Sequence, residues 1–223
     1  WWLCSSVPLL RSYRQKYFAE AEGHVVRNSF KRLGRTFLEL AKQKHIFVFL
    51  LAFFFYIDGV YTVIDMATAY GQALGLDSTG LLLALLVTQI VAFPCVLIFS
   101  RLVKKVRPET IITICIAAYF CIAVYAYWLD TQFDFWLLAV LVGMFQGTIQ
   151  ALSRSYFAKI IPAEKSGEFF GIYDICGKGA SVIGTALVSV LSQLTGSINI
   201  GVSALSVMFL IGLVLFRYSA KLN

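Results

Sequence analysis

Six apolar stretches of about twenty residues each follow one another between residues 45 and 217. A helix of that length crosses the roughly 30 Å of hydrocarbon in a bilayer. Helices satisfy their own backbone hydrogen bonds in lipid, and the short connections here favour antiparallel neighbours. We therefore expect an all-α membrane protein, a bundle of six transmembrane helices. The expected spans are 45–69, 80–100, 110–129, 133–153, 169–194 and 197–216.

The composition supports a membrane protein over a soluble one. Hydrophobic residues make up 59% of the 223 residues and charged residues only 14%. Soluble domains average roughly 45–50% apolar and about 25% charged residues. The chain is therefore expected to be an integral, multi-pass membrane protein.

The net charge of +7 is concentrated on one side of the expected spans. Nine of the nineteen Lys and Arg residues lie in 11–44, and four more lie between the second and third spans. Others surround the fourth-to-fifth connection and follow the last span, whereas the alternate connections carry acidic residues or no charge. This is the positive-inside pattern, which predicts that 11–44 and the C-terminus are cytoplasmic. It explains the net charge without a nucleic-acid partner.

These patterns divide the chain into four parts. Residues 1–10 have the composition of the end of a preceding transmembrane helix, so we expect a fragment or a processed product. Residues 11–44 form a basic cytoplasmic connector, 45–217 the bundle and 218–223 a cytoplasmic tail. Apolar residues between Phe30 and Ala41 recur at helical spacing among basic ones, which predicts an amphipathic helix. It would lie on anionic lipid or pack on the cytoplasmic ends of the bundle.

Four charged residues lie well inside the expected spans: Asp58, Asp65, Asp174 and Lys178. A charge in hydrocarbon costs several kcal/mol unless it faces a partner or a hydrated cavity. Asp58, Thr62 and Asp65 share one helical face. Asp58 would lie about 20 Å from the inner end of its span, and Asp65 close to the outer surface, where water alone could accommodate it. The charges indicate a polar route through the bundle.

Asp174 precedes Lys178 by four residues, the favourable order for an ion pair within a helix. Two interpretations follow from this spacing. The two residues neutralise each other and do nothing else, or Lys178 reaches Asp58, which would lie at a comparable depth.

Three polar residues of the fourth span, Gln146, Gln150 and Arg154, follow one another at one-turn spacing. Gln89 lies midway along the second span. Such amides can join helices, and Arg154 can simply mark the inner boundary. The alternative, which we favour, is the wall of a polar cavity that binds a carboxylate or a hydroxyl group.

The sequence contains no metalloprotease, hydrolase or phosphate-loop motif and no cluster of His or Cys ligands. We therefore expect no catalytic residues, no metal, no cofactor and no enzyme.

Two segments resemble motifs of a known family. Residues 55–60, Phe-Tyr-Ile-Asp-Gly-Val, are followed by Thr-Val-Ile at 62–64. Residues 143–155 read Gly-x-x-Gln-Gly-x-x-Gln-Ala-Leu-Ser-Arg-Ser and lead to Pro162 and to Phe-Phe-Gly-x-Tyr at 169–173. Both resemble the vacuole effluxer-like family, which is related to the autophagy permease of yeast vacuoles, within the major facilitator superfamily. Ile57 departs from an expected Asn, and Gly184-Thr185 stands where Gly-Pro is commoner.

The resemblance implies that the chain is the C-terminal six-helix half of a secondary transporter, with an N-terminal half missing. Such a permease moves a small polar solute, amino acids being one candidate for efflux, by alternating access and coupled to a proton or another ion. It also implies that the spans bearing Asp58 and Gln146/Gln150 line the cavity. The host membrane would be a bacterial cell membrane or a vacuolar-type membrane. A second hypothesis is a non-transporting receptor or scaffold that uses the basic connector.

Overall fold

The structure is a computed structural model that describes residues 6–8, 11, 25–73 and 75–222, and these residues form helices without any strand. Most of the expected helix end at 1–10, and residues 12–24 of the expected connector, lie outside the described residues.

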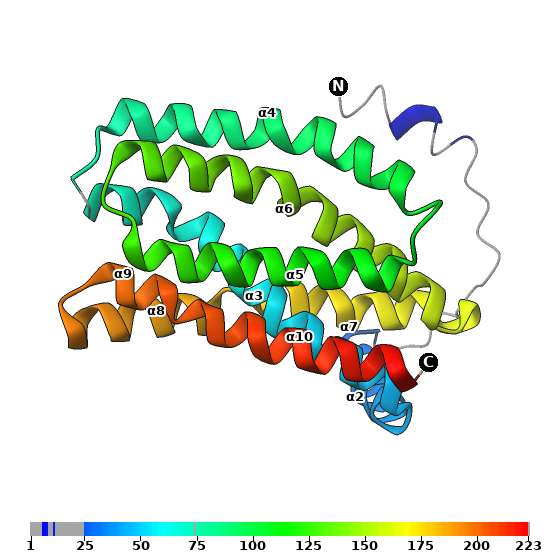
Figure 1. The fold of residues 1–223 in the computed structure, drawn as a ribbon. Helices are drawn as coiled ribbons and strands as arrows, with labels where there is room; N and C mark the ends of the chain where they lie inside the picture. The colour runs from blue at the N-terminus through cyan, green and yellow to red at the C-terminus, as the bar shows by residue number, and fades with distance from the viewer. Residues whose placement is uncertain (1–5, 9–10, 12–24, 74, 223) are drawn as a thin grey trace.

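The described residues contain six helical stretches that are long and apolar enough to cross a membrane, which confirms the predicted bundle (Figure 1). Two of the six stretches consist of two helices each, and one ends in a 3-10 turn, η1. In chain order they are α3 (Lys44–Ala73), α4 (Ser78–Leu102), α5 (Pro108–Tyr125) with η1 (Ala126–Trp128), α6 (Gln132–Ile160), α7 (Ser166–Gly179) with α8 (Val182–Thr195), and α9 (Ile198–Ser203) with α10 (Leu205–Leu222). A short 3-10 turn, η2 (Ala163–Lys165), precedes α7.

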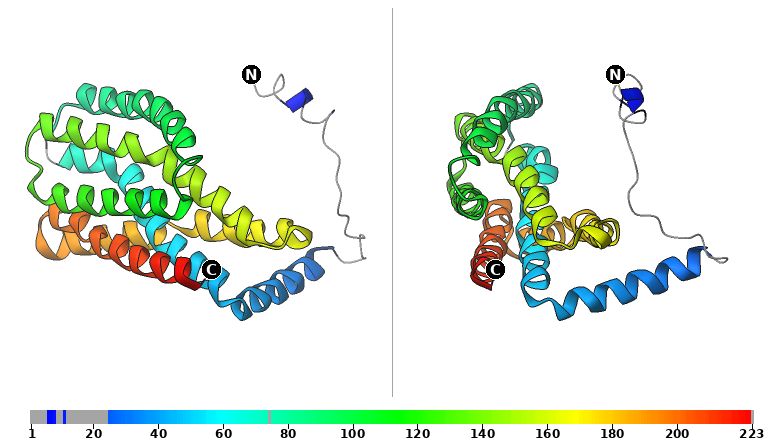
Figure 2. Two further views of the ribbon diagram at one scale, coloured as in Figure 1. Left: turned by 45° about the vertical axis from the view of Figure 1, so that its right-hand side comes forward. Right: turned by 90° about the vertical axis from the view of Figure 1, so that its right-hand side faces the viewer.

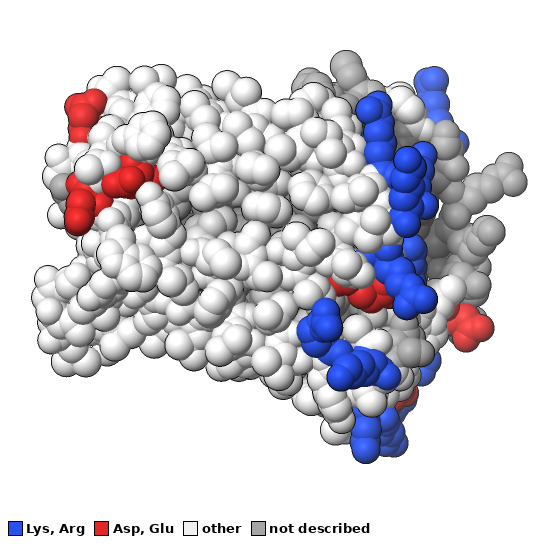
Figure 3. Space-filling view, viewed as in Figure 1, with Lys and Arg blue, Asp and Glu red and all other residues white. Residues whose placement is uncertain are grey.

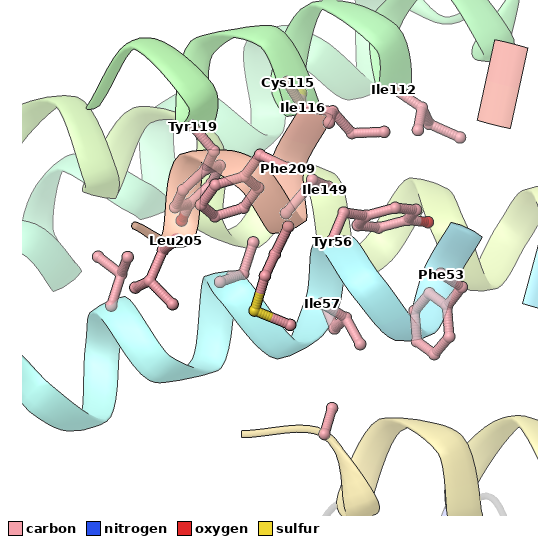
Figure 4. Close-up of a cluster of buried hydrophobic side chains, with 14 of the residues drawn as sticks. Phe53, Tyr56, Ile57, Ile112, Cys115, Ile116, Tyr119, Ile149, Leu205 and Phe209 are labelled. Carbon is pink, nitrogen blue, oxygen red and sulfur yellow. The ribbon is translucent and has the colours of Figure 1, made fainter. Parts of the chain in front are cut away.

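Helix α3 is the central helix of the bundle. It packs most extensively on α10 and also contacts α6, α7 and α8. Figure 4 shows the apolar core between α3, α5 and α10, where the rings of Tyr119 and Phe209 stack with centroids 5.4 Å apart. Helix α4 is peripheral: it packs on α6 and exposes large apolar side chains such as Leu86, Ile90 and Phe93. That exposed face suits contact with lipid.

Glycines set the closest approach between helices. Gly143 of α6 faces the backbone of Thr88 in α4, and a Cβ built at Gly143 would lie 2.7 Å from the Thr88 carbonyl oxygen. Gly212 of α10 is packed in the same way against Tyr56 of α3. Small residues in these positions are the usual means of close helix packing in membranes.

The charges are separated along the bundle (Figure 3). Lys and Arg gather at the end that carries α2 and the C-terminus of α10, where some acidic residues also lie, whereas the charged residues seen at the opposite end are all acidic. We call these the basic end and the acidic end. The one-sided distribution expected from the sequence is present, and the assignment of the basic end to the cytoplasm remains a prediction.

Helix α2 (Val25–Lys42) covers the segment in which an amphipathic helix was predicted, and it extends away from the bundle at the basic end (Figure 2). Its C-terminal part is fixed to the start of the fifth span. Thr36 donates a hydrogen bond to Glu168 (2.6 Å), and Glu39 pairs with Lys165 (2.6 Å). Leu40 is completely buried. This part of α2 therefore packs on the bundle, and contact of the helix with lipid remains a prediction.

The structure corrects three of the expected spans. The fourth span continues as helix to Ile160 rather than ending at residue 153, and the sixth is divided at Ala204. The fifth expected span, 169–194, lies within one membrane-length stretch, but it is not a single helix, because Ala180 and Ser181 separate α7 from α8. Ser181 has a φ of 77°, the left-handed region, which cannot continue an α-helix.

Replacing Gly143 by Ala should destabilise the protein by about 1–3 kcal/mol, because the added methyl group collides with backbone that cannot rotate away. Gly171→Ala in α7 is the matched control, since nothing lies within 4 Å of a Cβ there. The change from Gly to Ala raises the helix propensity equally in both variants. The difference between their free energies of unfolding therefore reports the cost of the packing collision alone. Thermal unfolding in detergent measures this difference in stability. Equal melting temperatures for the two variants would contradict the close α4–α6 contact.

Candidate functional site

The carboxylate of Asp58 lies at the start of α8. Its Oδ1 accepts hydrogen bonds from the backbone N–H of Ser181 (2.5 Å) and of Gly184 (3.1 Å), and Oδ2 also lies 3.1 Å from the Gly184 nitrogen. The first amides of a helix have no partner within the helix, and its N-terminus carries a partial positive charge. Ser181, the N-cap residue, makes no side-chain cap of its own. Asp58 therefore caps α8 from another helix.

Asp58 and the break lie at similar depths. Counted from Lys44, Asp58 is about 21 Å along α3, and Ala180 is about 21 Å along the fifth span counted from Ser166. The side chain of Asp58 is completely buried. Gly184 allows the contact, because a Cβ there would lie 3.0 Å from Oδ1 and 2.2 Å from Oγ1 of Thr62. Thr62 thus joins Asp58 in the same contact, as their shared helical face predicted.

The structure does not support Lys178 as the partner of Asp58, which was one interpretation of the sequence. Backbone amides, and not Lys178, satisfy the Asp58 carboxylate. Asp174 likewise pairs with Arg154 of α6, whose Nη2 lies 2.9 Å from Oδ1, and not with Lys178. No ion pair of Lys178 occurs within the described part of the chain. The intrahelical pairing predicted from the spacing of residues 174 and 178 is therefore not formed.

A polar cavity of about 220 Å³ lies between α3, α6 and α7. Four of the predicted site residues line it, together with aromatic and small side chains from the same three helices. The lining residues are Phe53, Ile57, Tyr61, Gln150, Arg154, Tyr173, Asp174, Gly177 and Lys178.

Aromatic rings support the charged groups of this cavity. The rings of Phe53 and Tyr173 stack with centroids 4.1 Å apart. The guanidinium carbon of Arg154 lies 5.9 Å from the ring centroid of Tyr173 and 5.5 Å from that of Phe170. Arg154 is thus held by a carboxylate and by two π faces. With Lys178, the cavity offers two cationic groups and one anionic group to a bound solute.

The remaining predicted residues lie elsewhere. Gln89 and Gln146 line a separate, mainly apolar cavity of about 40 Å³ between α3, α4 and α6. Asp65 is exposed on α3. The proposed continuous wall of Gln146, Gln150 and Arg154 is therefore divided between two cavities.

The two motif segments meet in the structure. The hydroxyl of Tyr56, beside Asp58, hydrogen-bonds to that of Ser153, beside Arg154 (2.6 Å), and both side chains are buried. This contact fixes α3 to α6 next to the polar cavity.

Sequence reasoning missed the aromatic lining, Phe53, Tyr61 and Tyr173, and the role of Ser181 and Gly184. Tyr61 and Tyr173 sit beside or within the motif segments that carried the family resemblance, so their position was a usable signal. Ser181 gave no signal in the sequence, because it contributes to the site through its backbone amide, which every residue except proline has.

A six-helix bundle with a cavity lined by charged side chains defines a multi-pass membrane protein, and comparison with known proteins identifies its family. A family model described as "Vacuole effluxer Atg22 like" matches residues 1–221, and the chain belongs to that family. A Bacillus subtilis protein named "Uncharacterized MFS-type transporter YxiO" is 46% identical over 218 residues, which cover 98% of this chain and 51% of the relative.

A more distant relative is "Autophagy-related protein 22" of Saccharomyces cerevisiae, 30% identical over 180 residues. That match covers 75% of this chain and 34% of the yeast protein. The chain thus spans about half the length, or less, of these curated relatives.

Replacing Asp58 by Ala should lower the free energy of unfolding by about 1–3 kcal/mol, because it leaves the amides of Ser181 and Gly184 buried without an acceptor. Asp65→Ala, at an exposed position two turns along the same helix, should change stability by no more than about 0.5 kcal/mol. Unfolding in detergent, followed by circular dichroism, measures both variants. Equal effects would contradict the capping role.

Proposed function

We propose that this chain forms the C-terminal half of a secondary active transporter that moves a small polar solute across a membrane by alternating access. One observation carries the proposal: a cavity of about 220 Å³, lined by Arg154, Asp174 and Lys178, lies within a membrane-spanning bundle. Charged groups in such a position are costly, and ion or substrate pathways are where they commonly occur. The family membership supports the same class of function.

The cavity chemistry favours a solute with a negatively charged group. Arg154 offers a planar set of donors suited to a carboxylate, and Lys178 offers a second cation. Asp174 can accept from an ammonium group, and Gln150 can donate to or accept from a neutral polar group. An amino acid matches this combination, so amino acids are the first solutes to test.

The second half of the transporter would complete the cavity. Arg154 and Asp174 expose 57% and 44% of their side chains, so their face of the bundle is open in this chain. A six-helix N-terminal half placed there would cover the polar face and leave the apolar face of α4 to lipid. The half-length match to the relatives supports this arrangement.

We place the basic end in the cytoplasm on the charge separation along the bundle. The 46% identity to a Bacillus protein supports a bacterial cell membrane as the location.

Coupling to a proton or another cation is assigned to Asp58. It is a carboxylate buried at mid-depth, and its neighbours Ile57 and Tyr61 on α3 line the cavity. A change in its protonation would therefore occur on the helix segment that lines the cavity.

Solute uptake should fall at least about tenfold when Arg154 or Lys178 is replaced by Met, because each variant removes a cation that binds the anionic group. Lys159→Met, an exposed cation of the same helix α6 outside the cavity, is the matched control. The measurement is uptake of labelled amino acids into proteoliposomes that contain the complete protein. Control-level uptake by both cavity variants would refute this solute site.

Asp58→Asn should remove the pH dependence of transport while leaving exchange of solute across the membrane possible, because Asn resembles a permanently protonated Asp. Flux measured from acidic to neutral pH, with and without an imposed proton gradient, tests this expectation. Asp130→Asn at the acidic end is the control acid. A variant with the natural pH profile would exclude Asp58 from coupling.

A further inference from the structure

The break between α7 and α8 depends on its surroundings. Ser181 has a left-handed φ of 77°, a conformation that residues with a side chain adopt rarely and that the surrounding structure must support. The backbone N–H of Ala180 donates a hydrogen bond to the Cys176 carbonyl at the end of α7, and the hydroxyl of Thr185 donates to the Ser181 carbonyl. No proline or glycine occupies the two break positions. Gly177, Gly179 and Gly184 nearby weaken a continuous helix, but they do not explain why the left-handed residue is Ser181.

Asp58 supplies the missing support. The groups that face its carboxylate are the amides of Ser181 and Gly184 from α8 and Thr62 from its own helix. No charged side chain pairs with it within the described residues. An ionised carboxylate can accept both amide hydrogen bonds, and a protonated one loses charge and part of its acceptor capacity. The strength of the cap therefore depends on the charge of this one group.

The residues that would move with the break are those of the polar cavity. Tyr173, Asp174, Gly177 and Lys178 lie on α7, within seven residues of Ala180, and no residue of α8 lines the cavity. A change in the angle between α7 and α8 would shift these side chains against Arg154 of α6. The far end of α7 is fixed to α2 by the Thr36–Glu168 hydrogen bond, and the preceding turn η2 by the Glu39–Lys165 pair, so a bend is favoured at the break.

We propose that Asp58 and the amides of Ser181 and Gly184 form a proton-controlled cap that sets the angle of α7 to α8 and so positions the cavity residues. This cap presupposes the proposed function: it would let protonation of Asp58 change the positions of the residues that bind the solute. In the ionised state the carboxylate holds the break. When a carboxylate oxygen takes up a proton, the cap weakens, and α7 and α8 move toward a straighter helix.

The test is the distance between spin labels on the two helices, measured across pH in the complete protein in lipid. Ile175 of α7 and Val190 of α8 are both exposed and suit labelling after replacement of the native cysteines. We expect the mean distance to shift as pH falls in the natural protein. Asp58→Asn should show the low-pH distance at every pH, and Asp130→Asn should behave as the natural protein does. A natural protein with one distance at all pH values, or an unchanged shift in Asp58→Asn, overturns the proposal.

A second variant pair tests the contact without altering the acid. Gly184→Ala places a methyl group against Thr62 and Asp58, so the cap cannot close, and the pH-dependent shift should be lost. Gly179→Ala, where nothing lies within 4 Å of the added Cβ, should retain it. Equal shifts in the two variants would overturn the proposal, even if Asp58→Asn fails to fold.

Solute flux on the same samples separates this inference from the proposed function. An Asp58-dependent distance shift without transport of any solute refutes the transporter and leaves the cap intact. Transport with no distance shift refutes the cap and leaves the transporter intact.

Discussion

The contact between the Asp58 carboxylate and the start of α8 offsets two unfavourable free energies: that of a buried charge and that of unpaired backbone amides. An ionised carboxylate removed from water needs charge-assisted hydrogen bonds to remain stable. A helix that begins in the middle of a membrane exposes unpaired amides where no water can satisfy them. Each side supplies what the other lacks, because two amides of α8 donate to the same side chain. The rest of the polar architecture depends on this contact.

The cap also explains why the cavity lies where it does. With the fifth span interrupted at Ala180, α7 can orient its polar residues toward α3 and α6 while α8 packs on α9. The buried hydrogen bond between Tyr56 and Ser153 keeps α3 and α6 in register beside Arg154. A structural cap and a solute site thus share one stretch of α3.

The sequence predicted the spans and the charge asymmetry well, because hydropathy over twenty residues and the placement of Lys and Arg are local properties. It also predicted that Asp58, at that depth, needs a partner or a hydrated cavity. It could not identify that partner, because the amides of Ser181 and Gly184 belong to the backbone and lie more than a hundred positions away along the chain. The break was missed for the same reason. The left-handed residue is Ser181, which is neither Pro nor Gly and is held by a tertiary contact, and the flanking Gly177, Gly179 and Gly184 do not identify it.

The pairing of Asp174 with Lys178 failed for a related reason. Spacing within one helix fixes which residues share a face, and it does not reveal which neighbouring helix competes for them. Arg154 reaches Asp174 from α6, where it is stacked on Tyr173 and Phe170. Lys178 is then not neutralised by Asp174, so its positive charge is available to a solute in the cavity.

Hydrogen exchange of the amides at 181–184 tests the central contact most directly. With Asp58 present, the amides of Ser181 and Gly184 should exchange slowly, although they begin a helix and have no partner within it. Replacement of Asp58 by Ala should make both exchange much faster, while amides in the middle of α8 keep their protection. Equal exchange of these two amides with and without the carboxylate would contradict the account.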